Sequence, residues 1–269
     1  MQKTILVTGS TDGIGLEAAK TLVSWGHHVL IHGRNPTKLA EAERVIRELP
    51  GEGRVEGYVA DLSVVANAES LATAVRDGHA TLDVLINNAG VFRTPDMLTP
   101  DGLDVRFAVN TIAPFVLTQR LLPLMDTSGR VINVSSAAQA PVDLQAVAGR
   151  VQLSDAEAYA QSKLALTMWS RRMAMALAGE GPAVIAVNPG SLLGTKMVRE
   201  GYGITGADVG IGADILARAA LADEFSVASG LYYDNDAGQF APPHPDALDP
   251  HKCQALVGAV EAVWAGAAE

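Results

Sequence analysis

The chain has 269 residues, a formal net charge of −10 and a hydrophobic content of 48%. This composition provides a sizeable core and excludes a disordered chain, and the negative charge argues against a protein that binds nucleic acid. The single cysteine, Cys253, excludes an internal disulfide and a zinc site built on cysteines. These features favour a globular protein of the cytosol.

The amino-terminal residues Met-Gln-Lys-Thr-Ile-Leu-Val lack the basic start and the apolar core of a secretory signal. No apolar run approaches the roughly 18 residues that are needed to span a bilayer. We therefore expect a cytoplasmic location, with neither a membrane nor a nucleic acid as a partner.

Short apolar segments alternate along the chain with longer amphipathic segments. The expected strands are residues 5–8, 28–32, 55–60, 84–86, 130–134 and 183–187. The expected helices are residues 15–25, 37–49, 63–77 with Ser63 as the cap, 103–124, 155–178 and 249–265. Strands without a hydrophilic face that alternate with helices predict a parallel sheet covered on both sides. We expect a single α/β domain over residues 1–269, with a doubly wound Rossmann-type sheet and helices on both faces.

A glycine-rich loop joins the first expected strand to the first expected helix. Its glycines, Gly9, Gly13 and Gly15, allow a tight turn and a close approach of the backbone to a pyrophosphate. The amino terminus of the helix offers free N–H groups and a positive dipole end to the same anion. A glycine turn without a ligand is the alternative, but the order strand, loop, helix favours a dinucleotide-binding loop.

Together with this loop, a series of motifs resembles the short-chain dehydrogenase/reductase family. The motifs are Asp61-Leu62, Asn87-Asn88-Ala89-Gly90, Asn110, Ser135-Ser136, Tyr159-x-x-x-Lys163 and Pro189-Gly190. Asp12 occupies the place of the second glycine of the extended branch, so the chain is similar to the shorter branch. The residues Tyr-Ala-Gln-Ser-Lys-Leu-Ala from Tyr159 resemble retinol-dehydrogenase-like members. The resemblance implies an NAD(P)-dependent oxidoreductase that moves a hydride between a nicotinamide cofactor and a carbonyl or alcohol substrate.

The residues after the second expected strand indicate which cofactor is used. Arg34 suits a 2′-phosphate, and no carboxylate is present there to bind a ribose 2′-hydroxyl. A solvated loop arginine is the alternative, and Asp12 is a counter-signal, because many NADP-dependent relatives have a basic residue at its position. We favour NADP(H) over NAD(H).

The resemblance also implies individual cofactor contacts. Asp61 would contact the adenine through its side chain, although a turn role is an equal alternative, and Thr195 would contact the nicotinamide carboxamide. The expected cofactor-binding residues are Gly9, Ser10, Asp12, Gly13, Ile14, Gly15, Arg34, Asn35, Asp61, Leu62, Asn88, Ala89, Gly90, Tyr159, Lys163, Pro189, Gly190 and Thr195.

Tyr159 and Lys163 are four residues apart and therefore share one face of a helix. A carbonyl that receives a hydride develops negative charge on its oxygen, and an acid must supply a proton there. A nearby ammonium lowers the pKa of a tyrosine from about 10. By resemblance, Tyr159 is the general acid/base, Lys163 lowers its pKa and binds the nicotinamide ribose, and Ser136 hydrogen-bonds the substrate oxygen. Asn110 would hold a water of a proton relay.

Two neighbouring serines end the fifth expected strand, Ser135 and Ser136. Because side chains alternate along a strand, only one of the two hydroxyls can face the cofactor. The family pattern favours Ser136.

The substrate pocket is expected to have walls near residues 138–155 and 191–206, and the second segment is either a mobile lid or an ordinary loop. Apolar residues in these segments and near residue 91 favour a lipophilic ketone, aldehyde or secondary alcohol. They are Val91, Phe92, Val142, Leu144, Leu192 and Leu193.

No metal site is expected, because the histidines lack ligand spacing and the segment Asp234-Asn235-Asp236 resembles a polar turn. The family resemblance implies a homodimer or a homotetramer. Two other functions stay open: a dinucleotide-sensing binding protein without turnover, and a reductase of an enoyl or imine bond.

Overall fold

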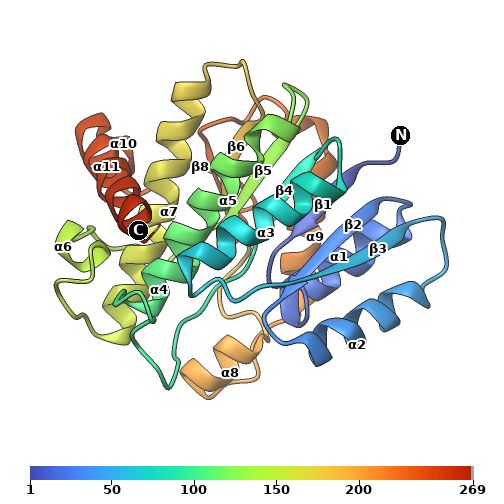
Figure 1. Ribbon diagram of the computed structural model, residues 1–269, viewed down its shortest axis with the longest axis horizontal. Coiled ribbons are helices and arrows are strands. Elements are labelled where there is room, and N and C mark those ends of the chain that lie inside the picture. The colour runs from blue at the N-terminus through green and yellow to red at the C-terminus, as the bar shows by residue number, and fades with distance from the viewer. Residues whose placement is uncertain (268–269) are drawn as a thin grey trace.

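The computed structural model describes residues 1–267, and all of its strands belong to one sheet (Figure 1). The order in the sheet is β3-β2-β1-β4-β5-β6-β7-β8, with β1 to β7 parallel and β8 antiparallel to β7. The strands are β1 (Thr4–Val7), β2 (His28–Gly33), β3 (Arg54–Val59), β4 (Val84–Asn87), β5 (Arg130–Val134), β6 (Ala183–Asn188), β7 (Tyr232–Asp234) and β8 (Gln239–Ala241). The predicted Rossmann-type sheet is confirmed.

Helices cover both faces of this sheet because side chains of each strand alternate between the faces. Leu6 and Leu85 pack on the face of α3 (Val65–Gly78), α5 (Ala113–Leu121) and α7 (Asp155–Leu177). Ile5 and Val7 pack on the face of α1 (Gly13–Ser24), α2 (Pro36–Arg47) and α9 (Val209–Leu221). The final helix, α11 (Pro250–Gly266), packs against α7. No helix within residues 1–267 is long and apolar enough to cross a membrane.

Shorter elements complete the fold. They are α4 (Val105–Phe107), a π-helical turn (Ala108–Ile112), α6 (Leu144–Val147), α8 (Lys196–Tyr202), α10 (Pro245–Leu248) and two 3₁₀ turns (Leu122–Leu124 and Asp223–Phe225). The helix expected over residues 103–124 is therefore interrupted. Pro114 lacks the N–H group that would continue the regular helical ladder at this point.

The expected cap of α3 is wrong. Ser63 donates its backbone N–H to the Asp61 carboxylate, and this turn delays the start of the helix to Val65. The N–H of Val65 donates to the carboxylate of Asp101, which belongs to a different loop. A contact across 36 positions in the chain thus replaces the local cap.

Candidate active site

A cavity of about 720 Å³ lies at the carboxyl ends of the parallel strands, around the point where the strand order reverses between β1 and β4. Open α/β sheets bind their ligands at this position. The lining contains most of the expected site residues: Gly9, Asp12, Gly13, Ile14, Gly15, Arg34, Asn35, Asp61, Leu62, Asn88, Ala89, Gly90, Ser136, Tyr159, Lys163, Pro189, Gly190 and Thr195. Ser10 and Asn110 lie behind the lining and are fully buried.

The glycine loop passes so close to its neighbours that two positions have no room for a side chain. A Cβ on Gly9 would lie 2.7 Å from the Cα of Ala89, and Gly9 also has a positive φ of 63°. A Cβ on Gly15 would lie 2.4 Å from Nδ2 of Asn88. The bare backbone leaves the start of α1 open to the cavity, and this arrangement fits a pyrophosphate.

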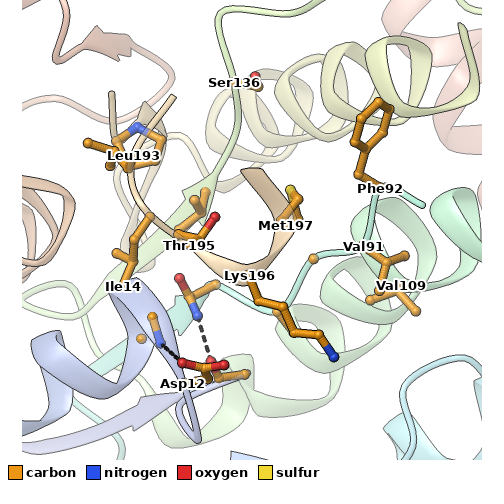
Figure 2. Close-up of a pocket in the computed structure, with 18 of the residues that line it drawn as sticks. Asp12, Ile14, Val91, Phe92, Val109, Ser136, Leu193, Thr195, Lys196 and Met197 are labelled. Atoms are coloured by element: carbon orange, nitrogen blue, oxygen red, sulfur yellow. Dashed lines mark hydrogen bonds between the residues drawn. The ribbon is translucent and has the colours of Figure 1, made fainter. Parts of the chain in front are cut away.

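Asp12 begins α1 as its N-cap, because its Oδ1 accepts the N–H of Gly13 at 2.8 Å (Figure 2). Thr195 lies opposite, with its methyl carbon 3.5 Å from the Cβ position of Gly13. Its hydroxyl accepts the N–H of Val198 and caps α8. Thr195 therefore lies over the glycine loop, and its contact with the carboxamide stays a prediction.

Asn88 ties the glycine loop to the end of β4. Its Nδ2 donates to the carbonyls of Thr8 at 2.9 Å and Gly9 at 3.0 Å. The Thr8 hydroxyl accepts the N–H groups of Asn88 and Ala89, both at 3.0 Å. These bonds join the ends of β1 and β4 where the cavity opens, so Asn88 both lines the cavity and fixes the position of the glycine loop.

His32 holds the glycine loop from the other side and was not among the expected site residues. Its Nδ1 accepts the N–H of Gly9 at 3.1 Å, and its Nε2 contacts the carbonyl of Ala60 at 3.0 Å. An acceptor at Nδ1 requires the proton to be on Nε2, so the ring is neutral. Burial lowers the pKa of His32 to about 4, which keeps the ring neutral near pH 7.

The stability of the protein should therefore fall in mild acid. Between pH 6.5 and about 4, the unfolded chain binds a proton at His32 that the folded chain does not bind, so the free energy of unfolding decreases as the pH falls. We expect a loss of about 2 kcal/mol at about pH 5. Urea unfolding near pH 7.5 and near pH 5 should show this loss in the wild type and a smaller one in His32→Gln. An equal loss in both proteins would contradict the role of His32.

Two cationic side chains, Arg34 and Lys38, line the cavity beyond the end of β2, and both are exposed. Asn35 accepts the N–H of Lys38 at 3.0 Å and caps α2, so it fixes the position at which that helix starts. Asp61 also lines the cavity and accepts the N–H of Ser63, so its turn role and its place in the site coexist. This end of the cavity is suited to an anionic group.

Tyr159 and Lys163 lie on α7 and both line the cavity. The Nζ of Lys163 donates to the carbonyl of Val134 at 2.7 Å and lies 5.8 Å from the ring centroid of Tyr159. Burial lowers the pKa of Lys163 to about 8. Burial raises the pKa of Tyr159, and a hydrogen bond with Ser136 opposes this effect. Desolvation thus dominates at Tyr159, in contrast to the expected lowering by Lys163.

The two serines at the end of β5 point in different directions. Ser135 is buried, and its hydroxyl contacts the carbonyl of Lys163 at 3.2 Å and the hydroxyl of Thr167 at 2.8 Å. The hydroxyl of Ser136 accepts the N–H of Ala138 at 3.1 Å and is the one that reaches Tyr159. The Ser135 hydroxyl is thus bonded to α7, and the role of Ser136 toward substrate stays a prediction.

Asn110 lies in the π-helical turn behind this group. Its Oδ1 accepts the N–H of Val91 at 2.8 Å, and its Nδ2 donates to the carbonyl of Val91 and to the hydroxyl of Ser162, both at 3.0 Å. The Cβ position of Gly90 is 3.5 Å from both Oδ1 of Asn110 and Nζ of Lys163. Asn110 therefore fixes the loop after β4 next to Lys163, and its relay role stays a prediction.

An aromatic wall borders Tyr159. The ring of Phe92 lies 5.1 Å from that of Tyr159 and stacks on Tyr202 of α8 at 5.6 Å. Val91, Val109 and Met197 add apolar surface near Phe92 (Figure 2). Met197 and Tyr202 lie within the expected segment 191–206, but the glycines around them are typical of a loop and gave no reason to single out these two side chains.

The two expected pocket segments contribute unequally. Residues 191–206 supply much of the lining, through the loop after β6 and through α8. From residues 138–155 only Ala138 reaches the cavity. The expectation for Val142 and Leu144 is wrong, since both pack against the core on the α7 face. The short helix α6 draws this segment toward α11 and away from the site.

Comparison with known proteins agrees with this geometry. Residues 3–202 match the family model of the short chain dehydrogenases. The chain is 37% identical over 195 residues to human polyprenol dehydrogenase, covering 69% of this chain and 59% of that protein. It is 30% identical to human retinol dehydrogenase 13, covering 86% of this chain and 76% of that protein. RhlG of Pseudomonas aeruginosa, solved with NADP, has a TM-score of 0.71 at 27% identity, covering 88% of this chain and 95% of RhlG.

Proposed function

The chain belongs to the short-chain dehydrogenase family and is an oxidoreductase acting on alcohol or carbonyl groups, and we propose that it uses NADP(H) to interconvert an apolar carbonyl compound and its alcohol. The observation that carries the proposal is that Ser136, Tyr159 and Lys163 line one cavity together with the glycine loop. The proton donor and the expected anion site therefore share a single binding space.

The residues of this cavity fit a dinucleotide. The open backbone at Gly9 and Gly15 would hold the pyrophosphate at the start of α1. Arg34 and Lys38 would bind a 2′-phosphate at the end of β2. NADP in the structure of RhlG supports this assignment.

The bound cofactor would supply or accept a hydride at the substrate carbon. In the reducing direction Tyr159 donates its hydroxyl proton to the carbonyl oxygen, and Ser136 donates a hydrogen bond to the same oxygen as negative charge develops there. Lys163 holds positive charge nearby and favours the tyrosinate that remains. Asn110 ties the loop after β4 to α7 through its bonds to Val91 and Ser162, and it would hold the water of the proposed relay that returns the proton.

Phe92, Met197 and Tyr202 support an apolar substrate, since they border Tyr159 with carbon surface. We also propose a cytoplasmic location and a homodimer or homotetramer. Of the methionines on α7, Met168 and Met173 are buried within this chain, whereas Met175 is exposed.

The cofactor preference can be tested at Arg34. Replacement of Arg34 by Ala should raise the KM for NADPH by about tenfold or more, because a charge-assisted bond to the 2′-phosphate is lost. The KM for NADH should change little, since NADH has a hydroxyl there. Initial rates with both cofactors provide the measurement.

Arg47→Ala is the matched control for this experiment. Arg47 is the last residue of α2, the helix that begins just after Arg34; it is exposed and pairs with Glu43, but it does not line the cavity. It should leave both KM values unchanged. An unchanged KM for NADPH in Arg34→Ala would exclude the proposed phosphate contact.

A further inference from the structure

The hairpin formed by β7 and β8 contacts the loops that follow β5 and β6, at the catalytic end of the cavity. The hydroxyl of Tyr232 donates to the carbonyl of Ser136 at 3.2 Å. The amide of Asn235 donates to the carbonyl of Pro189 at 2.9 Å. The sequence predicts a polar turn at Asp234, Asn235 and Asp236, and the function proposed above gives these residues no part.

The carboxylate of Asp236 accepts three hydrogen bonds, from Asn188 at the end of β6 and from Ser191 in the loop after it. Its Oδ1 accepts the N–H of Ser191 at 2.8 Å, and its Oδ2 accepts the Ser191 hydroxyl at 2.5 Å. Oδ2 also accepts Nδ2 of Asn188 at 2.9 Å. Asn188 is buried, and its second amide hydrogen goes to Asp234 at 2.9 Å. One exposed carboxylate therefore binds both ends of the turn that leads from β6 into the cavity wall.

The residue after Ser191 has a strained backbone. Leu192 has a positive φ of 52°, and Leu192 and Ala178 are the non-glycine residues with this conformation within residues 1–267. Such a conformation is unfavourable for a residue with a side chain and persists only where the surroundings hold it. The carbonyl of Leu192 accepts the N–H of Ala207 at 2.9 Å. The residue before it, Ser191, is held by its two hydrogen bonds to Asp236.

We propose that Asp236 is a positioning residue, which holds Ser191 and the strained turn at Leu192 so that residues 189–195 form the wall of the cavity beside Ser136 and Tyr159. Pro189, Gly190 and Leu193 in this turn line the cavity. β5 and β6 are neighbours in the sheet, so the turn lies next to the loop of Ser136. The inference depends on the proposed function for its cofactor, because this wall would contact the nicotinamide half.

The test is the variant Asp236→Asn, which keeps the size of the side chain but cannot accept from Ser191 and Asn188 as a carboxylate does. We expect a dissociation constant for NADPH about tenfold higher. The dissociation constant for adenosine 2′,5′-bisphosphate, which lacks the nicotinamide half, should stay the same. Ser191→Ala keeps the backbone bond and should have a smaller effect. The double variant should be less impaired than the sum of the two changes predicts.

Asp214→Asn is the control for the loss of one negative charge, since Asp214 is exposed on α9 and does not line the cavity. It should bind both ligands as the wild type does. If Asp236→Asn weakens both ligands equally, or neither, the positioning role is wrong.

A second measurement separates this inference from the proposed function. Amide hydrogen exchange without any ligand should be faster across residues 189–195 in Asp236→Asn and unchanged in Asp214→Asn. Unchanged exchange in Asp236→Asn would overturn the inference. If exchange is faster in Asp236→Asn but the wild type does not bind NADPH, the positioning role of Asp236 is supported and the proposed cofactor is rejected.

Discussion

Replacement of Tyr159 by Phe should lower kcat by about a thousandfold or more while the dissociation constant for NADPH changes little. The phenolic hydroxyl is the proton donor in the proposed reaction, and general acid catalysis contributes about 10²–10⁴ to a rate. The ring that packs on Phe92 at 5.1 Å is retained, so the shape of the wall survives. Steady-state kinetics together with fluorescence titration of NADPH separate the two quantities.

Tyr58→Phe is the matched control for this variant. The Tyr58 hydroxyl bonds to Glu56 and His79, and Tyr58 does not line the cavity. We expect its kcat to equal that of the wild type. Full activity in Tyr159→Phe would assign the proton to another group, and a large loss of NADPH affinity would make Tyr159 a binding residue.

Replacement of Arg106 by Met should have the largest effect on stability. Arg106 is 0% exposed and donates to the carboxylate of Asp104 at 2.6 and 2.8 Å, to Asp155 and to the carbonyl of Phe92. It thus joins α4, the first residue of α7 and the aromatic wall. Removal of one partner leaves the other charge buried and unpaired, which costs about 3–5 kcal/mol.

Urea unfolding gives the loss directly, and the Tm should fall by about 2–4 °C for each kcal/mol. Arg44→Met provides the comparison, because Arg44 is exposed on α2 and pairs with Glu41 and Glu48 at the surface. Its removal should cost less than about 1 kcal/mol. If the two variants lose the same free energy of unfolding, the buried hydrogen bonds of Arg106 do not stabilise the fold more than a surface ion pair does.

The strands were predictable because buried parallel strands are short, rich in β-branched residues and mostly apolar, as in β1 and β6. The hairpin of β7 and β8 was not predictable in this way, because each strand has only three residues. α9 was missed since Gly210 and Gly212 lower the helix propensity of its first turn. Its burial against α1 compensates for that loss.

Within the site, motif spacing located Tyr159 and Lys163 but not the partners that orient the loops. His32 holds Gly9 from 23 positions away, and Asp236 holds Ser191 from 45 positions away. Such bonds depend on the order of the strands in the sheet, and no local pattern shows them. The same reason explains why Val142 and Leu144, apolar and close to Ser136 in the chain, turned out to pack into the core.

We propose that the cavity holds NADP(H) and a carbonyl or alcohol substrate together for hydride transfer between them. The most direct test of this proposal is cofactor oxidation by the wild-type protein across a panel of apolar ketones and aldehydes, with NADPH and NADH in parallel. We expect turnover of at least one carbonyl compound, faster with NADPH than with NADH, and lowered about a thousandfold or more in Tyr159→Phe. Tight binding of NADPH without turnover of any carbonyl or alcohol, with either cofactor, would contradict it and indicate a dinucleotide-sensing protein.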